Sequence, residues 1–390
     1  MGNRKKPAIR FKGFTDDWEQ RKFEDIAVRS SSISSESGLP RVEYEDIISG
    51  TGRLNKDIFA KESDKTGIVF HKGDVLYGKL RPYLQNWLLP SFNGLAVGDF
   101  WVLQPQNADS SFLYRLIQSR QFDEVANQST GTKMPRSDWK LVSKTEFFIP
   151  STIGEQAAIG AYFGQLDNLI TLHQRKYDKL CVVKKSMLEK MFPKNGEKVP
   201  EVRFKGFSDD WEQRKLGECF SERVESMPDG ELISVTINDG IKKFSELGRH
   251  DNSNDDKSKY KKVCVGDIAY NSMRMWQGAS GYSPYEGIVS PAYTVLLPNV
   301  GIFSRCVAYQ FKLPQMIHTF QINSQGITSD NWNLKYPALS EIEIYISKKV
   351  EEQKQIAEFF ATLDHLITLH QRELEKFKNI KKSMLEKMFV

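Results

Sequence analysis

Apolar residues recur at alternating spacings of four and three over two long stretches of the chain, one from Gly154 to Phe192 and one that ends at Phe389. No proline interrupts either stretch, and this spacing is that of an amphipathic helix, so both are predicted to be long helices. The seam of the first comprises Ile159, Phe163, Leu166, Ile170, His173, Tyr177, Leu180, Lys184, Met187 and Met191, and that of the second Ile356, Phe360, Leu363, Ile367, His370, Leu374, Phe377, Lys381, Met384 and Met388. A seam this narrow requires a partner helix, and the sequence predicts that each helix pairs with the other. The alternative is two unrelated helices, each lying on its own domain.

The two stretches are copies of each other, offset by 197 residues (155 to 352), and they place His and Lys at the same heptad positions. A second string, Ile9 to Phe23, returns as Val202 to Leu216 at an offset of 193 residues (9 to 202). The chain therefore reads as a duplication of a domain followed by a helix, with predicted boundaries at 1–150, 151–193, 194–347 and 348–390. Duplication favours an antiparallel helix pair with His173 and His370 near its middle, both as packed structural residues rather than metal ligands.

Between the repeated strings the pattern changes to short β-rich runs separated by Gly and Asn. The predicted elements are strands at Val42–Ile48, Gly67–Phe70, Asp74–Tyr77, Leu95–Leu103 and Thr145–Ile149, a helix near Ser111–Ala126 and a mobile Ser-rich loop at Ser30–Gly38. The segment Leu232–Ser347 repeats this order, with Trp139 matched to Trp332, so four extra residues are expected between Trp332 and Ile346. The predicted fold class is α+β: two similar mixed α/β domains separated by two long helices that form an antiparallel coiled coil.

Composition narrows the class of protein. The 390 residues are 39% hydrophobic, and no run approaches the eighteen apolar residues of a membrane span. No apolar segment follows the basic N-terminus, so we expect a soluble cytoplasmic protein without a secretory signal. The four cysteines lack CxxC spacing and are expected to be reduced and mostly buried. A net charge of +5 permits a polyanionic partner without requiring one.

Motifs of enzymes are absent or incomplete in the sequence. Gly73 to Leu80 nearly fits a phosphate-binding loop, but Leu80 stands where a Ser or Thr hydroxyl is needed. The pairs Asp16-Asp17 and Asp209-Asp210 are predicted to form turns rather than a metal site. With no nucleophile elbow, zinc helix or paired CxxC, we expect no catalytic, cofactor-binding or metal-binding residue in this chain.

Basic and amide side chains interleaved with aromatic residues remain as the candidate chemistry. The candidates are Lys79, Arg81, Tyr83, Lys133 and Arg136 in the first domain and Lys242, Lys243, Asn271, Arg274, Gln277 and Asn331 in the second. Arg and Lys can donate to guanine, Asn and Gln can pair with adenine, and Lys also binds phosphate, so this set suits reading of DNA in the major groove. Solvated surface charge is the alternative, but two similar domains with different loop chemistry favour two different DNA sequences read at a set separation.

At these residues the chain resembles the specificity (S) subunit of type I restriction-modification systems. The resemblance rests on GDVLYGKLRPYL and GTKMPRSDW in the first domain, GDIAYNSMRMWQG and GIVSPAY in the second, and EQ at the start of each helix. It implies two target-recognition domains, each reading half of a bipartite site in double-stranded DNA, and two modification subunits docked on the helices. It also implies that those partners carry adenine methylation with S-adenosylmethionine, and that restriction subunits add ATP- and magnesium-dependent translocation and cleavage in bacterial defence.

Two other classes of function stay open from sequence. One is a single-chain nuclease or methyltransferase, and the other is a coiled-coil scaffold that does not bind DNA. The segment Gly326–Trp332 lacks the Lys and Arg of Gly131–Trp139, so DNA contacts of the first domain cannot be copied onto the second.

Overall fold

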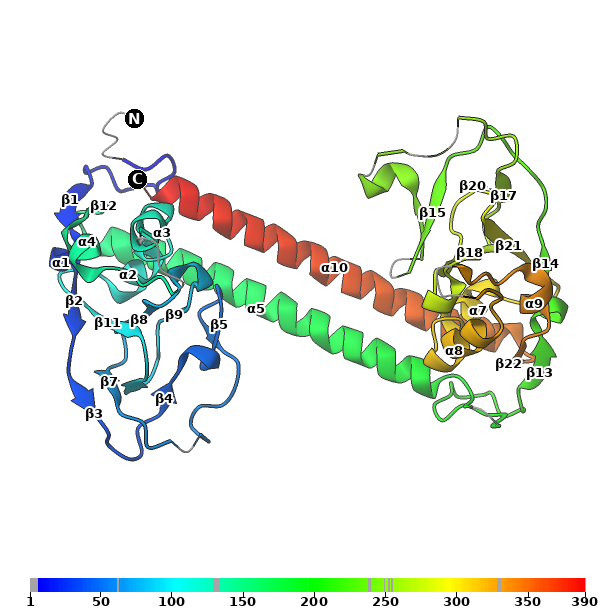
Figure 1. Ribbon diagram of the computed structural model, residues 1–390, viewed down its shortest axis with the longest axis horizontal. Helices are drawn as coiled ribbons and strands as arrows, with labels where there is room; N and C mark the ends of the chain where they lie inside the picture. The colour runs from blue at the N-terminus through cyan, green and yellow to red at the C-terminus, as the bar shows by residue number, and fades with distance from the viewer. Residues whose placement is uncertain are drawn as a thin grey trace. The chain divides into compact units, whose positions relative to one another are not determined.

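The computed structural model describes residues 6–61, 63–128, 134–194, 196–237, 240–248, 250–251, 253, 255–327 and 331–389. The chain divides into two compact units, Met1–Arg175 with Gln371–Val390 (unit 1) and Lys176–His370 (unit 2). Each unit thus contains one α/β domain and one part of each long helix (Figure 1). The boundaries predicted from the repeats keep each long helix whole, whereas the two packed units divide each long helix between them.

The domain of unit 1 is built on a four-stranded sheet with the order β2-β11-β8-β9. Its strands are β2 (Ala27–Ser30), β8 (Val75–Gly78), β9 (Trp87–Leu88) and β11 (Phe100–Pro105). A second sheet, β3-β7-β10-β4, comprises β3 (Ile33–Ser34), β4 (Arg41–Val42), β7 (Gly67–Phe70) and β10 (Gly94–Ala96). The remaining strands pair as β1 (Glu19–Lys22) with β12 (Glu146–Ile149) and β5 (Ile47–Ile48) with β6 (Arg53–Leu54). The helices and 3₁₀ turns are α1 (Phe23–Ile26), η1 (Tyr44–Asp46), η2 (Pro82–Leu84), α2 (Ser110–Leu116), α3 (Arg120–Ala126) and α4 (Trp139–Lys144).

The domain of unit 2 repeats the main sheet as β14-β21-β18-β19 and the terminal pair as β13-β22. These strands are β13 (Glu212–Lys215), β14 (Phe220–Glu222), β18 (Ile268–Asn271), β19 (Ser280–Tyr282), β21 (Tyr293–Pro298) and β22 (Glu343–Ile346). The second sheet differs, because β17 (Lys261–Val263) pairs with β20 (Gly287–Val289) while β15 (Ile233–Thr236) forms a hairpin with β16 (Gly240–Lys243). The helices and turns are α6 (Leu216–Cys219), η3 (Phe244–Leu247), η4 (Met275–Gln277), α7 (Ser304–Gln310), α8 (Pro314–Ile322) and α9 (Tyr336–Ser340).

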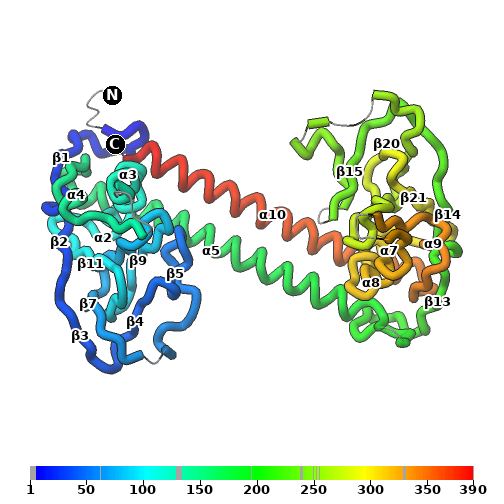
Figure 2. The backbone as a smooth tube through the Cα atoms, viewed as in Figure 1, coloured from blue at the N-terminus to red at the C-terminus, as the bar shows by residue number. Residues whose placement is uncertain are grey.

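The long helices α5 (Ile153–Lys190) and α10 (Val350–Met388) are antiparallel in both units, as predicted. In unit 1 the end of α10 reaches the start of α5, because Phe389 stacks on Phe112 with ring centroids 5.6 Å apart and lies 6.4 Å from Phe163. The backbone N–H of Ile9 donates to Lys387 at 3.1 Å, which places the N-terminal segment beside the last turn of α10 (Figure 2). In unit 2 the end of α5 reaches the start of α10 in the same way, because Phe192 after α5 stacks on Phe360 of α10.

The seam residues are all buried or half-buried, but not uniformly. The buried ones are Ile159, Phe163, Leu166, Met191, Ile356, Phe360, Leu363, Leu374 and Met388, and the half-buried ones are Ile170, His173, Tyr177, Leu180, Lys184, Met187, Ile367, His370, Phe377, Lys381 and Met384. Burial is deepest toward the two ends of the seam in each helix, because these ends enter the core of a domain as well as facing the other helix. The ring of His173 packs 5.4 Å from that of Phe377.

The repeated Lys of the seam forms an equivalent ion pair in each unit. Lys381 contacts Asp167 at 2.8 Å in unit 1, and Lys184 contacts Asp364 at 2.5 Å in unit 2. Both pairs join one long helix to the other, so the polar seam position is satisfied by the partner helix. Burial lowers the pKa of Lys381, and Asp167 partly opposes that shift.

Several predicted elements are wrong in detail. The run Leu95–Leu103 is two strands in different sheets, because Gly98 adopts a φ of 100° and turns the chain between β10 and β11. The predicted helix near Ser111–Ala126 is two helices, since Ser119 caps a new start by accepting from Phe122 N. Ser30–Gly38 contains strand β3, and the run Val42–Ile48 is interrupted by turn η1.

The match of Trp139 to Trp332 is also wrong. Helix α4 begins at Trp139 and its counterpart α9 begins at Tyr336, an offset that is already 197 (139 to 336). Ser137 N donates to Lys79 O and Leu334 N donates to Ser272 O, which makes the two segments equivalent at the same offset (137 to 334). The extra residues of the second domain therefore precede α9 and do not lie between Trp332 and Ile346.

None of the described helices is both long and apolar enough to cross a membrane. All four cysteines are free. Cys219 and Cys306 are buried, but Cys181 and Cys264 are partly exposed, so the expectation that most would be buried holds for only half of them.

Candidate nucleic-acid interface

The connection between β8 and β9 gathers the basic candidates of the first domain. Arg81 N donates to Pro135 O at 2.7 Å and Ser137 N donates to Lys79 O at 2.9 Å, so the segment 135–137 runs antiparallel to 79–81. This pairing brings Lys79, Arg81 and Arg136 together from positions more than fifty residues apart in sequence. Lys133 lies outside the described residues.

Asp99 lies at the centre of this cluster. Its carboxylate accepts from Arg136 Nη2 at 3.0 Å and lies 3.5 Å from Lys79 Nζ. Partial burial raises the pKa of Asp99, but the contacts with Arg136 and Lys79 outweigh it, so the pKa is lowered and the carboxylate stays charged. The hydroxyl of Tyr44 donates to Asp99 O at 2.6 Å and accepts from Leu80 N at 2.9 Å, which fixes the base of the cluster.

Turn η2 carries Tyr83 at its tip and is flanked by two residues in the left-handed region. Arg81 has φ 49° and ψ 63°, and Gln85 has φ 54° and ψ 45°. A non-glycine residue in this region costs roughly 1 kcal/mol or more, and such strain concentrates at functional sites. Hydrogen bonds from Leu84 N to Arg81 O and from Gly50 N to Gln85 O hold the turn in place.

The equivalent connection of the second domain, between β18 and β19, brings together Asn271, Arg274 and Gln277. Arg274 Nη1 donates to Gln277 Oε1 at 3.3 Å, and Asn271 Oδ1 accepts from Met273 N at 3.0 Å. Trp276 packs edge-on to Trp332 at 5.2 Å, so the segment that carries Asn331 lies beside this turn. The two domains therefore present different side chains from the same place in the sheet.

A buried lysine supports that second turn. Lys312 Nζ donates to three backbone carbonyls, Gly278 O at 2.6 Å, Ser280 O at 2.8 Å and Ile237 O at 3.1 Å. Burial lowers the pKa of Lys312 to about 8. Gly278 ends turn η4 in the left-handed region, so Lys312 fixes the base from which the turn projects.

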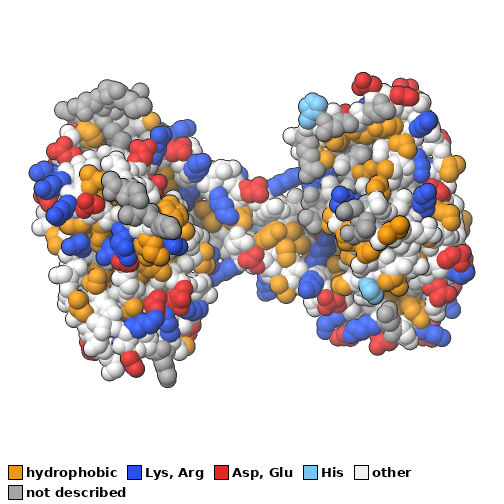
Figure 3. Space-filling model, viewed as in Figure 1, with side chains coloured by type: hydrophobic (Ala, Val, Ile, Leu, Met, Phe, Trp, Pro, Cys, Tyr) orange, Lys and Arg blue, Asp and Glu red, His pale blue; other side chains and the backbone are white. Residues whose placement is uncertain are grey.

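Lys242 and Lys243 are separate from this turn, on the hairpin of β15 and β16. Lys243 Nζ contacts Glu231 at 2.8 Å and lies 5.4 Å over the ring of Tyr285. The hairpin touches the main sheet where Gly240 and Gly281 meet, a contact close enough that a side chain on Gly281 would collide with the backbone of Gly240. Lys and Arg side chains of each unit are interspersed with acidic and hydrophobic ones on the face seen in Figure 3.

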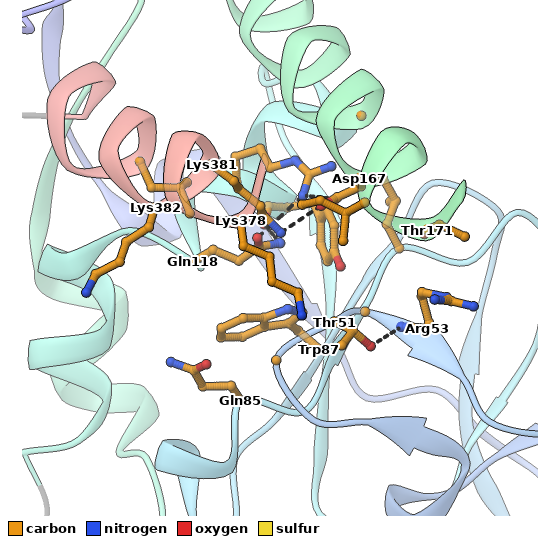
Figure 4. Close-up of a pocket in the computed structure, with 18 of the residues that line it drawn as sticks. Thr51, Arg53, Gln85, Trp87, Gln118, Asp167, Thr171, Lys378, Lys381 and Lys382 are labelled. Atoms are coloured by element: carbon orange, nitrogen blue, oxygen red, sulfur yellow. Dashed lines mark hydrogen bonds and ion pairs between the residues drawn. The ribbon is translucent and has the colours of Figure 1, made fainter. Parts of the chain in front are cut away.

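A cavity of about 1060 Å³ opens within unit 1 between the domain and the long helices. Figure 4 shows Lys378, Lys381 and Lys382 of α10 across the cavity from Trp87 and Gln85 of the domain. The carboxylate of Asp167 forms ion pairs with Arg115 at 2.7 Å and with Lys381. Among the described residues, Lys378, Lys382 and Arg53 form no ion pair, and although Asp123 and Glu386 also line the cavity, its basic side chains outnumber its acidic ones.

The sequence did not predict the residues that fix these turns. Asp99, Tyr44 and Lys312 lie in no motif, and each acts through contacts that only the folded chain creates. The repeats could have indicated a further pair, because Arg10 and Glu155 recur as Arg203 and Glu352. Arg10 forms a two-point ion pair with Glu155 at 2.6 and 2.7 Å, and Arg203 does the same with Glu352 at 2.6 and 2.9 Å.

The structure also accounts for the incomplete phosphate-binding motif. Gly73 is a turn residue with φ 97°, and residues Val75–Gly78 form strand β8, so the motif does not wrap a loop around an anion. Asp17 lies 3.1 Å from Lys6 and Asp209 lies 3.0 Å from Lys349, which is surface ion pairing. The described residues contain no group of three or more His, Cys, Asp or Glu side chains that could hold a metal ion.

Comparison with known proteins identifies the family. The model of the type I restriction modification DNA specificity domain matches the chain twice, over residues 15–181 and 208–379. The type I restriction enzyme MjaVIII specificity subunit of Methanocaldococcus jannaschii is 25% identical over 280 residues, which cover 67% of this chain and 65% of that protein. The EcoDI specificity subunit of Escherichia coli is 25% identical over 135 residues, which cover 33% of this chain and 30% of that protein. The matched stretches span less than two thirds of either relative.

A solved structure shares the fold along the whole chain. The crystal structure of the S subunit of a type I restriction-modification system from M. genitalium matches with a TM-score of 0.60 at 15% identity and covers 99% of both chains. The two matches to the family model cover most of the sequence and coincide with the two repeated domains. The chain therefore belongs to the type I restriction modification DNA specificity domain family and carries two copies of that domain.

Proposed function

We propose that the chain is the specificity subunit of a type I restriction-modification complex, in which each domain reads one half of a bipartite DNA site. The observation that carries the proposal is that the two family domains have main sheets of the same strand order but differ in the turn that projects from the sheet. Turn η2 stands among Lys79, Arg81 and Arg136, whereas turn η4 stands among Asn271, Arg274 and Gln277. A common scaffold with different hydrogen-bonding groups is what two different half-sites require.

In the first half-site, Arg81 and Arg136 donate to base edges or phosphates while Asp99 sets the position of Arg136. Guanidinium groups can form two hydrogen bonds with guanine, whereas amide side chains suit adenine. The second domain, with Asn271, Gln277 and Asn331, is therefore suited to a half-site that contains adenine. Lys378, Lys382 and Arg53 at the cavity of unit 1 are placed to contact the phosphate backbone beside η2.

Partner subunits complete the activity in this proposal. Two modification subunits dock on the long helices and carry adenine methylation with S-adenosylmethionine, and restriction subunits carry the ATP- and magnesium-dependent steps. Exposed apolar side chains on the helices, including Leu169, Leu172 and Leu369, are suited to such docking. The chain itself is proposed to hold no cofactor and to catalyse no step.

Reconstitution tests the proposal. The purified chain and its modification subunit are mixed with S-adenosylmethionine and genomic DNA, and methylated adenines are mapped by sequencing. We expect methylation at one bipartite sequence only when both proteins are present. Methyl transfer by the chain alone would show instead a single-chain methyltransferase, and a complex that neither binds nor methylates DNA would favour a scaffold.

A further inference from the structure

Turn η2 exposes large apolar side chains at the tip of the first domain. Tyr83 is 57% exposed and Leu84 is 37% exposed, and Met134, directly before the segment 135–137 that pairs with 79–81, is 51% exposed. Water is a poor environment for large apolar side chains exposed on two paired segments, so the folded protein alone does not account for this arrangement.

The tip is also held outward. Arg81 and Gln85 adopt left-handed conformations on either side of the turn, and backbone bonds to Pro135 and Gly50 anchor both ends. The ring of Pro82 fixes the backbone φ angle at the start of the turn. A loop free to relax would avoid this strain and fold its apolar residues inward, so the projection of Tyr83 and Leu84 is a built feature.

Cationic residues lie on the two paired segments from which the apolar tip projects. Lys79, Arg81 and Arg136 all lie within the two paired segments that support the turn, and Lys79 and Arg136 meet at Asp99. An apolar wedge flanked by basic side chains is the combination with which proteins enter a groove of DNA, separate two stacked base pairs and bend the duplex. A hydrophobic protein partner fits less well, because it would have to bury these charges.

Turn η4 of the second domain holds its aromatic residue differently, although Met273 beside it is 46% exposed and Ile327 is 98% exposed. In turn η4, Met275 is buried and Trp276 is packed against Trp332 with its indole N–H donating to Met273 O at 3.1 Å. The side chain of Gln277 accepts a hydrogen bond from Arg274. The equivalent turn thus keeps its aromatic residue against the protein, so the aromatic residue that projects into solvent at this place in the sheet is that of the first domain.

We propose that Tyr83 and Leu84 insert between neighbouring base pairs of the first half-site, unstack them and bend the DNA there. This inference rests on the proposed function, because it requires the first domain to bind DNA. It assigns the ring of Tyr83 to stacking, and not its hydroxyl to base reading.

The test uses the complete chain with its modification subunits on DNA that contains the methylated sequence, without S-adenosylmethionine. A 2-aminopurine probe replaces single bases of the first half-site other than the methylated adenine, and donor and acceptor dyes at the duplex ends report bending. We expect the probe to brighten on binding and the ends to approach. The double variant Tyr83→Ala, Leu84→Ala should lose both signals and bind the site about tenfold more weakly, since a stacking contact of this kind is lost.

Two single variants serve as controls. Tyr83→Phe keeps the ring and should keep the signals, and Ile33→Ala removes an apolar side chain that is 69% exposed on β3 of the same domain and should change nothing. Specific binding without brightening or bending, or signals that survive the double variant, would overturn the wedge and leave the proposed function intact. Absence of any sequence-specific binding by the wild-type complex would overturn both.

Discussion

The ion pair between Arg10 and Glu155 joins the N-terminal string to the first turn of α5, and its loss should destabilise unit 1. The side chain of Glu155 is 1% exposed and that of Arg10 is 12% exposed. Arg10 Nε and Nη2 donate to the two carboxylate oxygens at 2.6 and 2.7 Å, and Trp18 Nε1 donates to the same carboxylate at 3.2 Å. Glu155→Ala would leave the half-buried guanidinium without its counter-charge and the indole N–H without its acceptor.

The expected magnitude follows from that geometry. Removing one partner of a buried ion pair costs about 3 to 5 kcal/mol, mainly because the remaining charge stays desolvated. The side chain of Arg10 is partly exposed to solvent, so we expect Glu155→Ala to lower the free energy of unfolding by about 3 kcal/mol, the lower end of this range. Unfolding of a chain with two compact units need not be a single transition. Hydrogen exchange measured peptide by peptide is therefore the suitable assay, since it reports each unit separately.

We expect Glu155→Ala to speed amide exchange in the peptides of unit 1 and to leave unit 2 near the wild-type rate. Glu352→Ala removes the equivalent ion pair with Arg203 and should speed exchange in unit 2 while leaving unit 1 near the wild-type rate. Glu124→Ala breaks a surface ion pair with Arg120 and serves as the matched control, for which no change is expected. If Glu155→Ala were as mild as Glu124→Ala, the conclusion that this pair fixes the domain to the helix would be refuted.

Three further predictions concern the turns. Arg81→Ala should cost about 1 to 3 kcal/mol of binding and relax only the first half-site if Arg81 reads a base, whereas uniform weakening with a reduced salt slope in filter binding would assign it to phosphate. Asp99→Asn frees Lys79 and Arg136 from their carboxylate, so binding to unrelated DNA should tighten and its salt dependence steepen, and an unchanged salt slope would contradict the role given to Asp99. The pKa of Lys312 is lowered to about 8 from 10.5, so the unfolded chain binds more protons between these values and the stability of unit 2 should rise with pH across that range. Hydrogen exchange of unit 2 should show this rise in the wild type and not in Lys312→Met.

Much of the fold follows from patterns that repeat within the sequence. The antiparallel helices were predictable because the same seam occurs twice, and the fully buried positions Phe163 and Phe360 lie in it. Strand Gly67–Phe70 was predicted with its observed bounds, and Asp74–Tyr77 within one residue of β8. In these elements, local periodicity and tertiary packing favour the same structure.

The errors have local causes. A run as apolar as Leu95–Leu103 does not reveal the turn at Gly98, and Ser119 divides a helical pattern because its side chain caps a new start. Trp139 and Trp332 were matched by residue type, but Trp139 packs against Phe23 and Trp101 while Trp332 packs against Trp276. Identity of a side chain did not imply identity of its place in the fold.

The candidate site was only partly within reach of sequence. The pattern identified Arg81, Arg136 and Lys79 as residue types suited to DNA, but it could not show that segment 135–137 pairs with 79–81. It also could not show that Asp99 already engages two of them. Those facts depend on contacts between segments distant in the chain, which no local pattern encodes.

Exchange of one domain is the most direct test of the central claim. The segment 41–150 is replaced by the equivalent segment of another family member, and methylated adenines are mapped across the genome of a strain that carries the hybrid. We expect one half of the methylated sequence to change to that of the donor, while the other half and the spacing between them stay the same. A hybrid that methylates the original sequence, or one in which both halves change together, would contradict the claim that each domain reads its own half-site.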